Sequence, residues 1–219
     1  MALATRLQHL TAHATIAQRH VTFLNDITVL EDLQQPAPDW PSVTSVLARW
    51  WRLRVPNTYK ETAWRLTLNA FPTTQRMLHS VAPCPACGAA NPGQQHYFWS
   101  CPVAAAVRSV IEHQLLAFGL LPTGAHVQCS AVWLACLPHQ RLHRLIWDMV
   151  CLAAVHACDC GRRTAWAVSY QLNVPDLVQL VATRAAVAAF WEALADFAAT
   201  VKLRDRARVN LLTCQPFIS

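Results

Sequence analysis

Apolar residues recur at every third or fourth position along most of this chain, and that spacing places them on one face of an α-helix. The clearest stripe joins Val187, Phe190, Leu194 and Phe197, with Val201 as its next member. An apolar run at 127–137 is short enough for a strand, and its period does not decide between strand and helix. Helices are predicted over residues 1–33, 42–54, 58–71, 74–80, 103–118, 141–158 and 178–201.

Proline and capping signals set the limits of several of these helices. The prolines at 36, 38 and 41 prevent residues 34–41 from continuing the first helix, because proline lacks the backbone donor and clashes with the preceding turn. Thr58 followed by Glu61 forms a capping box, which predicts that the next helix has Thr58 as its N-cap. We divide the chain into an N-terminal helical segment with a Pro-rich linker (1–40), a central domain (41–110) and a C-terminal helical region (111–219).

Composition narrows the class of protein. Apolar residues make up 54% of the chain and charged residues 14%, against about 25% charged in soluble domains, so a disordered chain is excluded. The longest uncharged stretch, 114–140, is interrupted by glycine and proline and predicts no membrane-spanning helix. The first twenty residues contain arginine and no apolar core, so we expect no signal peptide and an intracellular protein, nuclear or cytoplasmic rather than secreted.

The strongest motif contains Cys84, Cys87, His96 and Cys101, in the spacing C-x2-C-x8-H-x4-C. Structural zinc takes four Cys or His ligands, and a Cys-x2-Cys pair presents two thiolates from one tight turn. Gly88 follows directly and suits the positive φ that such a turn requires. The alternative is four separately buried residues, since cysteine is among the most frequently buried residue types.

The flanks of the motif favour a metal site. Cys101 precedes Pro102, which is preferred at the first position of a helix, so we expect the Cys101 thiolate at a helix N-terminus. The motif offers no fifth cysteine and no adjacent carboxylate, which indicates a closed structural site with one Zn²⁺. The nine cysteines of the chain, an odd number, also fit metal ligands better than a disulfide framework. We therefore expect a mainly α, irregular helical domain with a zinc-stapled Cys-Cys-His-Cys loop.

Residues 64–107 resemble the reverse transcriptase zinc-binding domain, which lies downstream of the polymerase in many non-LTR retrotransposons. The resemblance covers about 44 of the 219 residues and implies that the same four residues are the zinc ligands. It also implies a reverse transcriptase polypeptide as a partner. The matching pieces are Trp64-Arg65-Leu66, Asn69-Ala70-Phe71-Pro72-Thr73, Cys84-Pro85-Ala86-Cys87-Gly88 and His96-Tyr97-Phe98-Trp99-Ser100-Cys101-Pro102.

Catalytic motifs are missing from the sequence. No Tyr-x-Asp-Asp is present, so the chain lacks the carboxylates with which a polymerase binds its metal ions. Pro175-Asp176 is similar to the start of a restriction-like nuclease motif, but no downstream acid-x-Lys follows it. We expect a protein that is not an enzyme.

The basic residues are concentrated around the metal motif. Residues 41–110 carry a net charge of +6, with Glu61 as the only acid, and the whole chain also has a formal net charge of +6. Arginine makes bidentate phosphate contacts, so we expect these residues to bind RNA or DNA. Trp50, Trp51, Trp64 and Trp99 could stack on bases where they are exposed. The candidate nucleic-acid-binding residues are Arg49, Arg52, Arg54, Lys60, Arg65 and Arg76.

Two functions follow from this reading. In the first, the chain is a non-catalytic, nucleic-acid-binding accessory module of a retrotransposon polyprotein. In the second, it is a zinc-stapled helical scaffold for protein–protein interaction. The two differ in whether the basic residues share one exposed face.

A weaker constellation lies further along the chain. His156, Cys158 and Cys160 offer three soft ligands and are followed by Gly161. The simpler interpretation is a cysteine-rich helix end capped by Gly161. A second metal site remains an open alternative.

Overall fold

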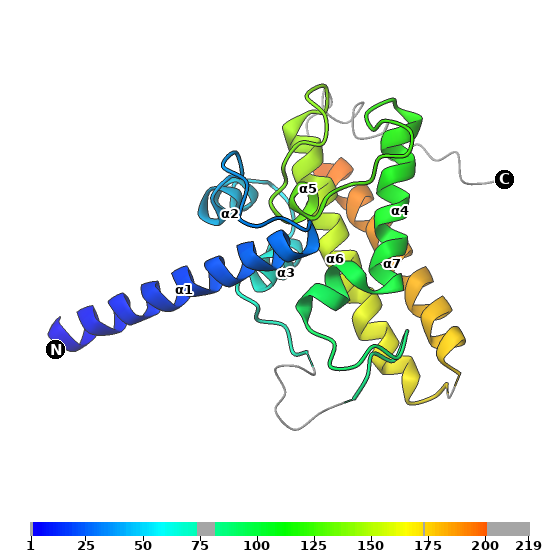
Figure 1. Cartoon of the computed structure of the whole chain (residues 1–219), viewed down its shortest axis with the longest axis horizontal. Helices are drawn as coiled ribbons and strands as arrows, with labels where there is room; N and C mark the ends of the chain where they lie inside the picture. The colour runs from blue at the N-terminus through cyan, green and yellow to red at the C-terminus, as the bar shows by residue number, and fades with distance from the viewer. Residues whose placement is uncertain (1, 74–81, 173, 201–219) are drawn as a thin grey trace.

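The computed structural model describes residues 2–73, 82–172 and 174–200 of the chain (Figure 1). Regular structure in these residues is helical throughout, and the prediction of a mainly α fold with a Cys-Cys-His-Cys cluster able to hold a metal is confirmed. The elements are α1 (Ala2–Leu30), α2 (Val43–Trp51), α3 (Asn57–Thr67), the π-helical turn η1 (His96–Ser100), α4 (Pro102–Ala117), α5 (Cys129–Trp133), α6 (Arg144–Ser169) and α7 (Pro175–Thr200).

The central element of the fold is α6. Helices α3, α4, α5 and α7 all pack against it, and α6 and α7 form a helical hairpin (Figure 1). Met149, Cys151, Leu152 and Ala157 of α6 are at most 1% exposed. Burial on several sides means that α6 is the helix around which the others are arranged.

Close approach between helices depends on Gly161. The expectation that this helix ends near Cys158 with Gly161 as its cap is wrong, because α6 continues for two more turns. A Cβ at Gly161 would stand 2.5 Å from Val103 Cγ1, 2.9 Å from Ala186 Cβ and 3.2 Å from the Ala182 carbonyl oxygen. The missing side chain therefore lets α4 and α7 pack directly on the backbone of α6.

The described contacts between helix α1 and the body come from its C-terminal turns. Phe23 and Ile27 are fully buried, and the Phe23 ring stacks on Trp133 with centroids 5.4 Å apart. Gln95 donates a hydrogen bond to Asp26 at 2.8 Å. The first turns of α1 extend away from the other helices (Figure 1).

A buried carboxylate fixes α2 on α6. Asp148 is 1% exposed and accepts hydrogen bonds from Arg49 Nε at 2.8 and 2.9 Å and from Trp50 Nε1 at 3.1 Å. The Ser42 side chain caps the first turn of α2 by accepting from the Ser45 backbone N–H at 3.2 Å. An ion pair with an indole donor satisfies the carboxylate, which would otherwise be costly to bury.

Several predicted boundaries change. The capping box at Thr58 is wrong: the N-cap of α3 is Pro56, two residues earlier, and it makes no side-chain capping bond. The 127–137 run contains the short helix α5, and residues 34–41 are non-helical as their prolines predict. The predicted helix at 74–80 and Val201 lie outside the described residues. The boundary proposed at residue 110 falls within α4, and the three-part division stays a prediction.

One described helix, α7, is long and apolar enough to cross a membrane by length and composition alone. Its buried face, which includes Ala182, Phe190 and Phe197, packs against α6 and α4. The apolar stripe predicted this helix at 178–201, and the charges of Asp176, Arg184, Glu192 and Asp196 interrupt its apolar run.

We predict that Gly161→Ala destabilises the protein. Overpacking costs about 1–3 kcal/mol, whereas alanine gains only about 1 kcal/mol in helix propensity, so the thermal midpoint should fall. Val103→Ala in the same chain removes the nearest clashing atom and should restore part of the loss. Calorimetry of both variants measures this, and a single variant as stable as the parent would contradict the close packing.

Candidate metal centre

The first two candidate ligands lie on one tight turn. The Cys84 carbonyl oxygen accepts the backbone N–H groups of Cys87 at 3.3 Å and Gly88 at 2.7 Å, and the Cys84 N–H donates to the Ala89 carbonyl at 2.8 Å. Gly88 has φ +73°, as expected, and no atom lies within 4 Å of where its Cβ would be. The glycine is therefore required by backbone conformation and not by lack of space.

The π-helical turn η1 positions the other two candidate ligands, His96 and Cys101. His96 begins this turn, and its carbonyl oxygen accepts the Cys101 backbone N–H at 2.7 Å. Cys101 is the N-cap of α4, with Pro102 at the first helical position, as the sequence predicts. Turns of this kind are frequent at functional sites, where they shift a side chain out of ordinary helical register.

The four side chains converge. The Sγ atoms of Cys84, Cys87 and Cys101 and a ring nitrogen of His96 all lie within 4.8 Å of one another. Cys84 Sγ is 4.0 Å from Cys101 Sγ, and Cys87 Sγ is 3.4 Å from His96 Nε2. Tetrahedral zinc with ordinary bond lengths separates two sulfurs by about 3.8 Å, and a sulfur from a nitrogen by about 3.5 Å. This group could therefore bind one metal ion with little rearrangement.

Electrostatics inside the cluster favour a cation. The hydrogen bond with Cys101 and then burial raise the pKa of Cys84, whereas the same hydrogen bond and the Val103 backbone N–H lower the pKa of Cys101. Burial raises the pKa of Cys87. Cys84 and Cys101 thus share a proton, and a metal ion would take its place.

The cluster is anchored on α6 through Arg162. The guanidinium of Arg162 donates to Asp159 at 2.6 and 3.0 Å and to the Pro72 carbonyl at 3.2 Å. It also lies 5.6 Å from the centroid of the Phe71 ring and 5.9 Å from that of Tyr97, the residue after His96. Sequence reasoning missed Arg162, because nothing in its neighbourhood along the chain distinguishes it from a solvated arginine.

The candidate nucleic-acid-binding residues do not behave as one set. Arg49 is paired with Asp148, and Lys60 is buried, with Nζ 3.4 Å from the Trp51 carbonyl oxygen. Arg52, Arg54 and Arg65 are exposed. Arg76 lies outside the described residues.

The four tryptophans proposed for base stacking also differ in their exposure. Trp51 is 45% and Trp64 42% exposed. Trp50 is buried against Asp148, and Trp99 is partly covered by Arg108, whose guanidinium carbon lies 4.4 Å from the centroid of its ring. Only Trp51 and Trp64 of the four meet the condition of exposure that base stacking requires.

Comparison with known proteins adds nothing to these observations. The chain matches no protein family, no curated protein and no solved structure.

We predict that Gly88→Ala weakens metal binding about fivefold or more. A non-glycine residue in the left-handed region costs roughly 1–2 kcal/mol, and the turn that carries Cys84 and Cys87 needs that conformation. Gly124→Ala is the matched control, because Gly124 has φ +82° with equally open surroundings and lies outside the 84–101 segment. Competition with a chromogenic chelator measures the affinity, and equal affinities for the two variants would contradict the prediction.

Proposed function

We propose that this chain is a non-catalytic zinc-binding module that holds RNA or DNA. One structural Zn²⁺ fixes the 84–101 loop on the helical core, and a neighbouring surface of tryptophan and arginine binds a single strand. The observation that carries the zinc proposal is the convergence of three thiols and one imidazole at tetrahedral separations.

The donor set favours zinc over other common cations. Three thiolates and an imidazole suit Zn²⁺, whereas Mg²⁺ and Ca²⁺ prefer oxygen ligands. Cys84 and Cys101 are buried, and the four side chains offer one ligand atom each, which is the number that a tetrahedral site takes. An ion held in this way has no open position for a water or a substrate, which supports a structural role.

The proposed nucleic-acid surface consists of Trp51, Arg52, Arg54, Trp64 and Arg65. Lys60 connects its two parts: Lys60 Nζ lies 5.7 Å from the centroid of the Trp51 ring, and Trp64 follows Lys60 by one turn on α3. Exposed indoles with arginine beside them suit single strands, because bases stack on the rings and phosphates pair with the guanidinium groups.

The proposed origin in a retrotransposon polyprotein is supported by the order of motifs between Trp64 and Val107. The cluster geometry is compatible with that resemblance, which assigns the same four ligands. A reverse transcriptase polypeptide is the partner that this origin implies.

A second candidate function is the zinc-stapled scaffold for protein–protein interaction. The observation in its favour is a row of exposed apolar side chains on α7, namely Leu177, Leu180 and Val181. Such a row is typical of a helix that packs on another protein.

Metal analysis tests the zinc proposal. Purified protein should contain one tightly held zinc ion, and Cys84→Ser should lower that content several-fold because a ligand is lost. Cys136→Ser is the matched control, since Cys136 is a half-buried thiol outside the cluster. Equal zinc in the Cys84→Ser variant and the parent would contradict the assignment.

A salt titration tests nucleic-acid binding. Replacing Arg52, Arg54 and Arg65 with alanine removes three phosphate contacts, so the slope of log affinity against log salt should become shallower by about 2. Zinc content should stay the same. Arg184→Ala, which removes an exposed charge from α7, should leave the slope unchanged.

Two further outcomes separate the candidate functions. Trp64→Ala should weaken binding about tenfold at constant salt slope, because it removes stacking and no charge. If the parent protein shows no RNA or DNA binding at low salt, the nucleic-acid proposal fails and the scaffold proposal remains.

A further inference from the structure

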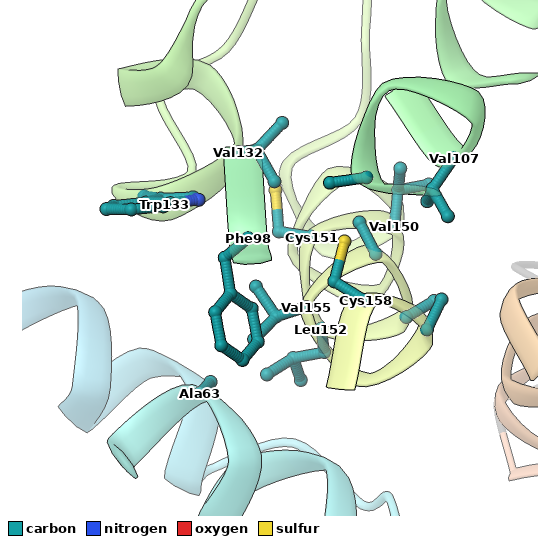
Figure 2. Packing of buried hydrophobic residues seen from close by; sticks show 14 of the residues in the cluster. Ala63, Phe98, Val107, Val132, Trp133, Val150, Cys151, Leu152, Val155 and Cys158 are labelled. Carbon is teal, nitrogen blue, oxygen red and sulfur yellow. The ribbon is translucent and has the colours of Figure 1, made fainter. Parts of the chain in front are cut away.

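A second pair of metal-binding residue types lies outside the 84–101 cluster. His156 and Cys160 are one turn apart on α6, with Cys160 Sγ 3.4 Å from His156 Nε2. The third member of the sequence constellation does not join them. Cys158 is buried among core side chains with Val107 and Val155, and Figure 2 shows it there.

The separation of the pair is the one that a bound ion requires. A thiolate and an imidazole on tetrahedral zinc lie about 3.5 Å apart. The Cys87–His96 contact in the first cluster is also 3.4 Å. Residues four apart on a helix can therefore chelate one ion without a backbone change, as in helical His-x3-His sites.

Carboxylates of α7 and a phenol of α3 surround the pair. Tyr59 Oη donates to Asp196 Oδ2 at 2.6 Å, and the Tyr59 ring meets the His156 ring edge-on with centroids 4.6 Å apart. Glu192 lies one turn before Asp196 and is exposed. Both carboxylates act electrostatically on His156, but their oxygens do not converge with the pair as the ligands of the first cluster do.

The charges around the imidazole come from four residues of α6 and α7 besides the pair itself. Burial and then the Arg163 cation lower the pKa of His156, while Asp159, Asp196 and Glu192 act in the opposite direction.

We propose that His156 and Cys160 bind a second, soft divalent cation such as Zn²⁺ or Cd²⁺, with water completing the tetrahedron. On binding, the Cys160 thiol releases its proton to solvent and neutral His156 bonds through Nε2. The remaining ring proton then lies on Nδ1, which is buried and has no hydrogen-bond partner in the described part of the chain.

Arg163 takes part as an outer contact. Its guanidinium donates to Cys160 Sγ at 3.3 Å while Nε pairs with Asp159 at 3.1 Å. A donor to a ligating sulfur stabilises the thiolate and orients it. Because His156 and Cys160 are only partly buried, this ion exchanges more readily than the one in the closed cluster.

A Cd²⁺ titration followed by calorimetry and metal analysis tests the proposal on the full chain. The parent should bind two ions, the second more weakly. His156→Ala and Cys160→Ser should each lower the affinity of the second site at least tenfold, whereas Cys136→Ser should still bind two. Circular dichroism of each variant checks that the helices remain.

The variants distinguish loss of the first metal site from loss of the second. Cys84→Ser should lose the tight ion and keep the weaker one. With Co²⁺ as the probe, the second equivalent should add about one third of the thiolate-to-metal absorption of the first, because it bonds to one sulfur instead of three. A parent that binds one ion, or a second ion that persists in folded His156→Ala and Cys160→Ser proteins, would overturn the proposal.

Discussion

The placement of the metal cluster depends on one buried cation, the guanidinium of Arg162. It joins three parts of the chain: Asp159 on its own helix, the Pro72 carbonyl after α3, and the Tyr97 ring in η1. Pro72 precedes the candidate ligands along the sequence, and Tyr97 lies between His96 and Cys101. A buried guanidinium is costly unless its donors are satisfied, so the chain segments that satisfy it are held in place relative to α6.

Arg49 and Arg162 show that basic residues have two separate roles in this protein. Both are partly or fully buried and bond to acids of α6, namely Asp148 and Asp159. Their charges are neutralised within the fold. The basic block of the sequence is therefore a mixture of structural cations and exposed ones, and only the exposed ones are available to an external anion.

Local signals in the sequence predicted the helices and the cluster well. Gly88 after the second cysteine and Pro102 after the last one identified the turn and the helix N-terminus, because each acts through its own backbone conformation. Residues that act across the fold were not predictable in this way. Glycine is the residue type that commonly caps a helix C-terminus, so the sequence alone suggests that role for Gly161. The close packing of Val103 and Ala186 against its Cα is what explains the glycine.

The same difference between local signals and contacts across the fold explains why neighbouring basic residues, and neighbouring cysteines, have different surroundings. Arg49 and Arg52 are three positions apart, yet one is paired with Asp148 from 99 residues further along and the other is exposed. Cys158 and Cys160 are two positions apart and therefore point to different sides of α6, one into the core and one toward His156. Helical periodicity predicts that such neighbours lie on different faces of the helix, but it does not predict which face is buried.

The loop itself shows what an ion bound in the cluster would stabilise. The ten residues from Cys84 to Gly93 form no helix, and the buried apolar side chains among them are those of Cys84, Ala86 and Pro92. Ordering ten residues costs about 10–20 kcal/mol in backbone entropy, far more than burial of one thiol, one methyl group and one proline ring recovers. Zinc bound by a small domain contributes about 10–16 kcal/mol, which is of the size needed. The metal ion is thus the interaction that can hold this loop against the helices, while α6 supplies the surface on which it is held.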